Sequence, residues 1–239
     1  MVKCASYNCG SIRSKSEVVK SLLDTCDIVF LQELMLNKTD LDVLDEFDEN
    51  FKHFAYVNDR DAQGIDKGRP RKGVAVFFRR ELSSVVSPIF IDDSFIGIVL
   101  EHENCNFLFL NVYLPCDMQD MNSLDEYRHS LASIEDIIKE ENINNVIIIG
   151  DLNADPFKGR FWKELLSFRE KLSLGCVDLS LPDDTFTYLC PAKNTTSWLD
   201  HILCSGHLFK SVSNIFVDFR YALFDHFPMC FDFDLIVNN

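Results

Sequence analysis

Val146-Ile147-Ile148-Ile149 runs directly into Gly150-Asp151-Leu152-Asn153-Ala154-Asp155 near the middle of the chain. The four aliphatic residues are β-branched and bounded by turn residues, which is typical of a short buried strand. A strand that ends in Gly-Asp-x-Asn delivers a carboxylate and an amide to its carboxyl end, although an ordinary Asx turn uses the same residue types. In α/β folds that edge collects ligands and catalytic groups. The stretch therefore predicts an α/β fold with a polar site beside residues 150–155.

Further acidic residues stand beside other predicted strands. Glu33 follows an apolar run at 28–32, and the pairs Asp200-His201 and Asp225-His226 come later in the chain. Each has an ordinary interpretation alone: Glu33 as a solvated loop residue and Asp225 as a turn or helix cap. Together with the Gly-Asp-x-Asn stretch, they supply hard oxygen donors and carboxylate–histidine pairs. Such a set suits divalent-metal chemistry on phosphate esters.

The composition predicts one globular domain over residues 1–239. The chain is 47% hydrophobic and contains 21 Phe, enough to bury a substantial core. It contains no apolar stretch of about 18 residues, and its start has no long apolar segment, so we expect neither a membrane partner nor secretion. The nine cysteines are odd in number and include no Cys-x-x-Cys pair. Reduced thiols in an intracellular protein, nuclear or cytoplasmic, are therefore expected.

The net charge of −15 argues against strong non-specific binding to nucleic acids. A metal-dependent nuclease can still be acidic, because bound cations and a local basic loop mediate its contact with phosphate. The segment 60–72 is such a loop candidate, and it includes Arg69, Arg71 and Lys72. A solvated loop without a ligand is the alternative. Trp198 could stack on a base, but we expect it in the core.

Strand and helix signals alternate along the chain, and the second half repeats the theme of the first without a linker. This order predicts one α/β unit built in two halves. Thr39 is expected to cap the second helix, and Ser123-Leu124-Asp125-Glu126 fits a capping box for the third. The expected strands cover 2–8, 28–32, 54–57, 74–78, 96–100, 107–113, 146–149, 185–189, 199–204, 212–217 and 228–235, and the expected helices cover 17–23, 39–47, 123–141 and 159–168.

Six short motifs follow one another along nearly the whole chain. They are Ser6-Tyr7-Asn8, Phe30-Leu31-Gln32-Glu33, Asn111-Val112-Tyr113-Leu114-Pro115, Gly150-Asp151-Leu152-Asn153, Ser197-Trp198-Leu199-Asp200-His201-Ile202-Leu203 and Asp225-His226. This order resembles the endonuclease/exonuclease/phosphatase superfamily. Within it, the runs at 109–116, 196–203 and 68–75 look most like the apurinic-like endonuclease domain of non-LTR (LINE-type) retrotransposons.

The resemblance implies a DNase-like fold, a four-layered α/β sandwich of two mostly antiparallel sheets flanked by helices. It places the active site at the strand-end edge between the sheets. It implies that Glu33 ligates Mg²⁺, with Asn8 close by and Asp225 near the metal, and that Mn²⁺ can substitute. Tyr113 would touch the phosphate or the leaving group, and Thr187 occupies the place of an active-site threonine that binds substrate. One metal or two remain open.

The resemblance also assigns the catalytic groups. Asp151 would orient or deprotonate the attacking water, and Asn153 would help to hold phosphate or water. His226 would contact the scissile phosphate, with Asp200 orienting its ring. The chemistry agrees, because phosphodiester hydrolysis needs an activated water and stabilisation of the charge that develops on oxygen.

One position departs from the family pattern. The family usually carries a small Ser immediately before the final Asp-His pair, and this chain carries Phe224. A phenyl ring cannot donate a hydrogen bond from a hydroxyl, which predicts weaker catalysis.

Three functions follow from these observations. The first is an Mg²⁺-dependent DNA endonuclease that nicks target DNA for retrotransposition. The second is a phosphatase or phosphodiesterase on inositol or lipid phosphates. The segment Ser197-Trp198-Leu199-Asp200 is similar to the inositol-phosphatase branch, although His201 stands where that branch usually has Arg. The third is a binding module with impaired catalysis, which the acidity and Phe224 favour.

Overall fold

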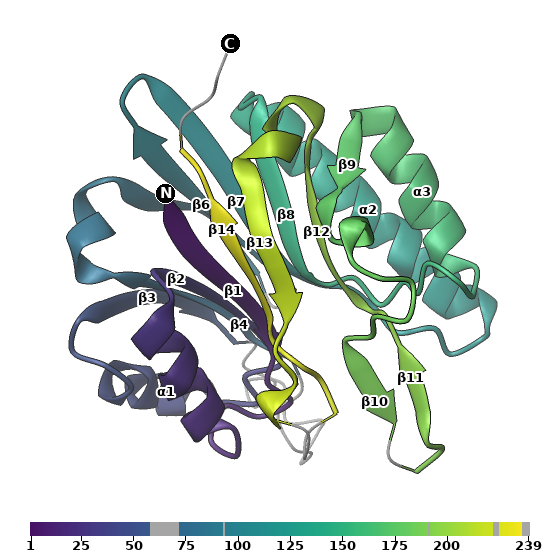
Figure 1. Ribbon diagram of the computed structural model, residues 1–239, viewed down its shortest axis with the longest axis horizontal. Coiled ribbons are helices and arrows are strands. Elements are labelled where there is room, and N and C mark those ends of the chain that lie inside the picture. The colour runs from purple at the N-terminus through teal and green to yellow at the C-terminus, as the bar shows by residue number, and fades with distance from the viewer. Residues whose placement is uncertain (58–71, 93, 191, 222–224, 236–239) are drawn as a thin grey trace.

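Two six-stranded sheets pack face to face in the computed structural model (Figure 1), which describes residues 1–57, 72–92, 94–190, 192–221 and 225–235. The first sheet contains β1 (Val2–Asn8), β2 (Ile28–Gln32), β3 (Phe51–Tyr56), β4 (Val74–Arg79), β13 (Val212–Val217) and β14 (Met229–Phe233), in the order β13-β14-β1-β2-β4-β3. The second contains β5 (Val86–Ile91), β6 (Phe95–His102), β7 (Cys105–Tyr113), β8 (Asn145–Asp151), β9 (Leu174–Cys176) and β12 (Asp200–Ser205), in the order β5-β6-β7-β8-β12-β9.

Each sheet contains one parallel pair among its described strands, and a helix joins the two members of each pair. α1 (Ser16–Thr25) connects the parallel strands β1 and β2, and α2 (Met121–Glu141) connects β7 and β8. The remaining described pairings in the two sheets are antiparallel. Parallel neighbouring strands need such a crossover, because a tight turn can join only antiparallel strands. The prediction of two mostly antiparallel sheets flanked by helices is confirmed.

Large apolar side chains fill the space between the sheets. Phe30 of β2 and Phe109 of β7 stack with ring centroids 5.9 Å apart, and Phe233 of β14 meets Phe109 edge-on at 5.4 Å. On the outer faces, α1 covers the first sheet, while α2 and α3 (Phe161–Leu172) cover the second (Figure 1). The central strands are thus buried on both faces, which explains their nearly continuous aliphatic sequences.

Two predicted helix caps are wrong. Asp120, not Ser123, caps α2, because its Oδ1 accepts the backbone N–H of Ser123 at 2.8 Å. Thr39 lies inside the 3₁₀ helix η1 (Lys38–Glu46), which has no side-chain cap. The residue that caps a helix is the one at which the chain leaves the preceding loop. Residue type and spacing do not determine where that point lies.

Three strands, β5, β9 and β11, were not predicted. β9 and β11 (Thr195–Ser197) have three residues each, too few to show a periodic pattern, and β5 contains Pro88 beside a register shift. β11 pairs with β10 (Tyr188–Cys190) in a hairpin that projects beyond one end of the sandwich (Figure 1). This hairpin lies at the same end as the predicted site.

Short 3₁₀ segments occur between several strands. They are Arg80–Ser84, Val177–Ser180, Gly206–Ser211 and Phe219–Tyr221.

Among the described helices, none is long and apolar enough to cross a membrane. The assignment of residues 1–239 to one domain stays a prediction.

Candidate active site

The carboxyl ends of both parallel strand pairs lie at one end of the sandwich. β1 ends at Asn8 and Glu33 follows β2, while β7 ends at Tyr113 and β8 at Asp151. The strand register places Asn8 beside Gln32 in the first sheet and Tyr113 beside Asp151 in the second. The two β-α-β units therefore bring four polar side chains to one edge, where α/β folds place their ligands.

Asn8 connects the two sheets at this edge. Its Nδ2 donates to Glu33 Oε1 at 2.9 Å and to Asp151 Oδ2 at 2.9 Å, and its Oδ1 accepts the backbone N–H of Gly10 at 3.1 Å. The amide nitrogen, not the oxygen, thus faces the two carboxylates. In this arrangement Asn8 holds two anionic groups at a fixed separation, and its place at the metal site stays a prediction.

Unusual backbone conformations occur where the polar residues leave the strands. Gly150 has a φ of 141°, and a Cβ at this position would lie 2.0 Å from the carbonyl oxygen of Val112, so only glycine fits. Glu33 and Asn153 have φ values of 54° and 50°. Such a conformation costs on the order of 1–3 kcal/mol and is concentrated at functional sites. Asn153 is held in place because its Nδ2 donates to the carbonyl of Leu114 at 2.9 Å.

Asp151 bears a buried carboxylate among other acids. Burial, followed by the charge of Asp200, raises its pKa from the ordinary 3.8 to about 7, and Glu33 acts in the same direction. Ligand atoms of Asp151, Asp200 and His226 lie within 4.8 Å of one another. A divalent cation would relieve the repulsion between Asp151 and Glu33, whose hard oxygens are the donors that Mg²⁺ prefers. The residues present therefore fit a divalent cation.

His226 faces Asp151 and is held by Asp200. Its Nδ1 lies 3.0 Å from Asp200 Oδ2, and its Nε2 lies 3.9 Å from Asp151 Oδ2. Burial opposes a charged ring, but Asp200, followed by Asp151, outweighs burial and raises the pKa of His226 to about 9. A ring that Asp200 orients through Nδ1 keeps Nε2–H directed at the cleft.

Thr187 contacts the backbone of Asp200, and Asp225 directly precedes His226. Thr187 is fully buried, and its hydroxyl oxygen accepts the backbone N–H groups of Leu199 and Asp200 at 3.0 Å each. The Thr187 hydroxyl thus positions the strand that carries Asp200, and its role in binding substrate stays a prediction. The exposed Asp225 accepts the backbone N–H of His226 at 3.1 Å and is not among the described residues that line the cleft.

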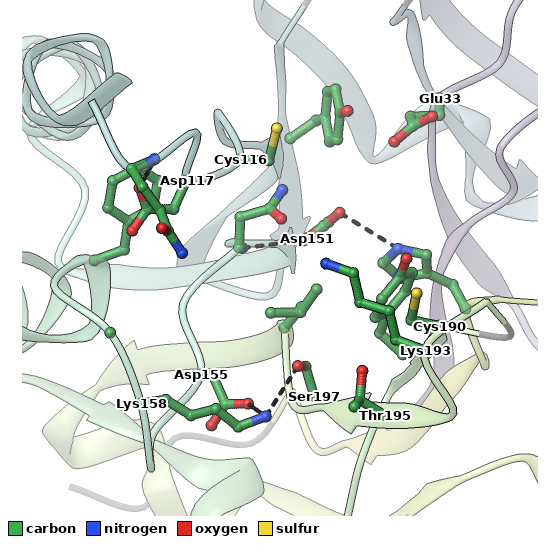
Figure 2. A pocket seen from close by; sticks show the side chains of 18 residues that line it. Glu33, Cys116, Asp117, Asp151, Asp155, Lys158, Cys190, Lys193, Thr195 and Ser197 are labelled. Carbon is green, nitrogen blue, oxygen red and sulfur yellow. Dashed lines mark hydrogen bonds and ion pairs between the residues drawn. The ribbon is translucent and has the colours of Figure 1, made fainter. Parts of the chain in front are cut away.

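Residues of the predicted site line an open cleft of about 560 Å³ (Figure 2). Glu33, Tyr113, Asp151 and His226 line it, and Lys193 of the β10–β11 hairpin points into it (Figure 2). Burial, followed by the charge of Glu33, raises the pKa of Tyr113, so its hydroxyl remains a hydrogen-bond donor at neutral pH. The cleft thus contains carboxylates, a cationic histidine, a phenol and a lysine.

The predicted basic loop falls mostly outside the described residues. Arg69, Arg71 and Phe224 lie there, so their roles stay predictions. Lys72 is half-buried, its Nζ donates to Ser94 Oγ at 3.1 Å, and it is not among the described residues that line the cleft.

Two buried polar pairs behind the site were not predicted. Gln32 Nε2 donates to Asn111 Oδ1 at 2.6 Å, and His201 Nδ1 lies 2.8 Å from Asp178 Oδ2. Asn111 could have been found, because an amide inside an otherwise apolar strand is a buried polar group that needs a partner. Asp178 gave no such signal. Trp198 is buried beside His201, which confirms its assignment to the core.

The fold and the site together agree with one known family. The model of the endonuclease/exonuclease/phosphatase family matches residues 5–221. The chain belongs to this family. A search of curated proteins gives no match for the sequence.

Solved structures with the same fold include proteins that are described by different activities. NExo from Neisseria, a 3′ phosphatase bound to a product DNA hairpin, is 16% identical, with 98% of this chain and 100% of that chain covered and a TM-score of 0.71. An AP endonuclease from Archaeoglobus fulgidus has the same identity, coverage and TM-score. The endonuclease domain of TRAS1, a telomere-specific non-LTR retrotransposon, is 14% identical, with 98% of each chain covered and a TM-score of 0.73. At these identities the likeness shows the shared fold.

Proposed function

We propose that this protein is a divalent-metal-dependent phosphodiester hydrolase that acts on DNA, and specifically an endonuclease. The observation that carries the proposal is the arrangement around Asp151. Asn8 joins Asp151 to Glu33 across the two sheets, and His226, held by Asp200, stands 3.9 Å from Asp151 on its other side. A phosphate in the cleft beside these groups would meet anionic ligands for a cation and the cationic ring of His226.

Asp151 is the group that we assign to the attacking water. Its Oδ2 accepts the bond from Asn8 and its Oδ1 accepts the backbone N–H of Asn153 at 3.0 Å, so the carboxylate has a fixed orientation. A carboxylate oxygen held in a fixed orientation beside the cleft can orient a water molecule there and accept its proton. Asn153 lines the cleft beside it and can hold the water or a phosphate oxygen.

The positive charge and the hydrogen-bond donors of the site stabilise the phosphate. His226 presents Nε2–H to the cleft and would stabilise negative charge on the phosphoryl oxygens. Tyr113 keeps its proton and would donate to the phosphate or to the leaving oxygen. Glu33, with Asp151, would hold the cation, for which we propose Mg²⁺ with Mn²⁺ as a substitute. When bound, the cation supplies Lewis-acid stabilisation of the same charge.

DNA is the proposed partner because a nicking enzyme needs an open cleft and local positive charge. The cleft is open, and Lys193 of the hairpin points into it (Figure 2). The basic run around Arg69 and Arg71 supports contact with a phosphate backbone. The resemblance of the runs at 109–116 and 196–203 to non-LTR retrotransposon endonucleases supports the finer proposal of target-site nicking for retrotransposition.

A substrate panel with Mg²⁺ tests the proposal. Closed circular plasmid has no ends, so its conversion to a nicked circle requires endonuclease activity. The same plasmid with an abasic site, a duplex with a 3′ phosphate and inositol phosphates test the other activities. We expect nicking of closed circles by the wild type and little by Asp151→Asn. Phosphate release from inositol phosphates without nicking would contradict the DNA assignment, and no turnover of any of these substrates would favour a binding module.

A further inference from the structure

Gln32 and Asn111 are the polar exceptions in a stretch of apolar contact between the sheets. Both side chains are 0% exposed. Two residues earlier on the same two strands, Phe30 and Phe109 stack across the same interface at 5.9 Å. Apolar side chains would fill this space at no cost in unpaired polar groups, so the presence of two amides needs another explanation.

The two amides bond directly across the interface. Gln32 Nε2 of the first sheet donates to Asn111 Oδ1 of the second at 2.6 Å, and to Ser6 Oγ at 3.2 Å. In the opposite direction, Asn111 Nδ2 donates to the backbone carbonyls of Leu31 and Ala75, at 3.0 Å each. One side chain of β7 is thereby attached to both β2 and β4. These directional bonds hold the two sheets at one separation and one register, which apolar contact alone does not specify.

This cross-sheet clasp, Gln32 with Asn111, lies directly beneath the catalytic edge. Gln32 immediately precedes Glu33, and Asn111 is two residues before Tyr113 on β7. Glu33 directly follows β2 of the first sheet, whereas Tyr113 and Asp151 end two strands of the second. The distances between these groups therefore depend on how far apart the two strand ends are held.

We propose that Gln32 and Asn111 are positioning residues, which set the distance between Glu33 and the Asp151–Tyr113 side of the cleft and so tune the divalent-cation site. This inference rests on the proposed metal-dependent function. Neither residue touches the reacting atoms; they act through the strands that carry Glu33 and Tyr113. Partners that orient metal ligands typically change metal affinity or activity by about 10- to 100-fold when removed.

Binding of Mn²⁺ to the metal-free protein, measured by calorimetry, provides a readout that does not depend on catalysis. Asn111→Leu removes the clasp at similar volume, and we expect it to raise the Kd for Mn²⁺ by about 10-fold or more. Phe109→Leu is the matched control, because it lies on the same strand and the same face but makes only core contacts. It should lower Tm and leave the Kd within about 2-fold, since its loss is confined to packing.

Gln32→Met provides a milder variant if Asn111→Leu does not fold. It removes the bond to Asn111 and leaves the two bonds from Asn111 to backbone carbonyls, so we expect a smaller rise in Kd with a cooperative melt. Equal Kd values for the wild type and a folded clasp variant, or an equal rise in Phe109→Leu, would overturn the proposal. Failure of the wild type to bind Mn²⁺ would overturn both the clasp and the metal assignment. Normal Mn²⁺ binding without DNA nicking would overturn only the proposed function.

Discussion

Two buried histidines in this molecule each pair with an aspartate, yet their surroundings differ. His226 bonds to Asp200 through Nδ1 at 3.0 Å and lines the cleft with its other side. His201 bonds to Asp178 through Nδ1 at 2.8 Å, and its Nε2 donates to the carbonyl of Ala154 at 2.7 Å. The His226 ring keeps Nε2 for a ligand in the cleft, whereas the His201 ring uses both nitrogens in hydrogen bonds within the fold.

The electrostatics of the two pairs are similar, which shows that a perturbed pKa does not by itself identify a catalytic group. Burial opposes a charge on either ring, and the carboxylate partner outweighs it in both, so the pKa of His201 and that of His226 are both raised. Both partners of His201 are acceptors, which requires a protonated ring. Access to the cleft is the feature that distinguishes them, and it supports the proposed catalytic role of His226 and a structural role for His201.

The same substitution at both histidines should separate these roles most strongly. His226→Gln removes the cationic donor of the cleft, and we expect kcat for plasmid nicking to fall by a factor on the order of 10² or more. His201→Gln leaves the buried Asp178 without its cation, which costs about 3–5 kcal/mol of stability. Nicking rates and melting temperatures of both variants test this. A cool melt with normal kcat for His226→Gln, or the reverse pattern for His201→Gln, would contradict the comparison.

Asp151 and His226, the two titrating groups of the cleft described above, should make the stability of the protein depend on pH. Without divalent cations, Asp151 favours the fold while protonated, below its ordinary pKa of 3.8, and this contribution is lost as pH rises through about 7. His226 favours the fold below 6.5 and loses its contribution as pH rises through about 9. We therefore expect the unfolding free energy to fall by on the order of a few kcal/mol between about pH 4 and pH 9.

Urea unfolding in chelator across this range measures the effect, with Asp151→Asn as the matched variant. That variant should flatten the profile below about pH 7, because the amide does not titrate. Added Mg²⁺ should restore stability near neutral pH in the wild type. Profiles of the same shape for the wild type and Asp151→Asn would mean that Asp151 is not held with a raised pKa.

Loss of one anionic ligand should affect the metal requirement more than the fold. Glu33→Gln keeps the shape of the side chain and removes a carboxylate that binds the cation, so the Mg²⁺ concentration for half-maximal nicking should rise by about 10-fold. Asp178→Asn, in the buried pair with His201, should leave the Mg²⁺ concentration for half-maximal nicking unchanged in the folded fraction. Equal Mg²⁺ requirements for Glu33→Gln and the wild type would remove Glu33 from the metal site.

The smallest effect is expected from the basic loop. Joint neutralisation of Arg69, Arg71 and Lys72 should weaken DNA binding and reduce the salt dependence by about 0.9 in log–log slope for each phosphate that the loop no longer neutralises. Neutralisation of Lys139 and Lys171, which pair with Glu135 on the outer helices, serves as the control. The same salt dependence of DNA binding in the loop variant and the wild type would mean that the loop is solvated and does not contact DNA.

The sequence predicted the parts of this molecule that depend on local pattern. The run 146–149 and its Gly-Asp-x-Asn ending correctly placed a buried strand with Asp151 at its carboxyl end, because burial on both faces and a required glycine leave clear signals. The ordered motifs predicted the sandwich. Gly150 shows why the signal is so strong: only glycine avoids the carbonyl of Val112.

Features set by long-range contacts could not be predicted in this way. The orientation of Thr187 depends on the pairing of residues 187–189 with 225–227, which brings distant segments together. The Asp178–His201 pair joins residues 23 positions apart through β9, which is too short to show a pattern. The side of Asn8 that faces the carboxylates is likewise a matter of packing, and sequence spacing carries no trace of it.

Nicking of closed circular DNA by the wild type and by Asp151→Asn, each with Mg²⁺ and with excess chelator, tests whether a divalent-metal-dependent site is built around Asp151. We expect conversion to nicked circles by the wild type with Mg²⁺, none in chelator, and a rate lower by about 10²-fold or more for Asp151→Asn. Equal nicking by both proteins, or undiminished nicking in chelator, would contradict the assignment of a divalent-metal-dependent site built around Asp151.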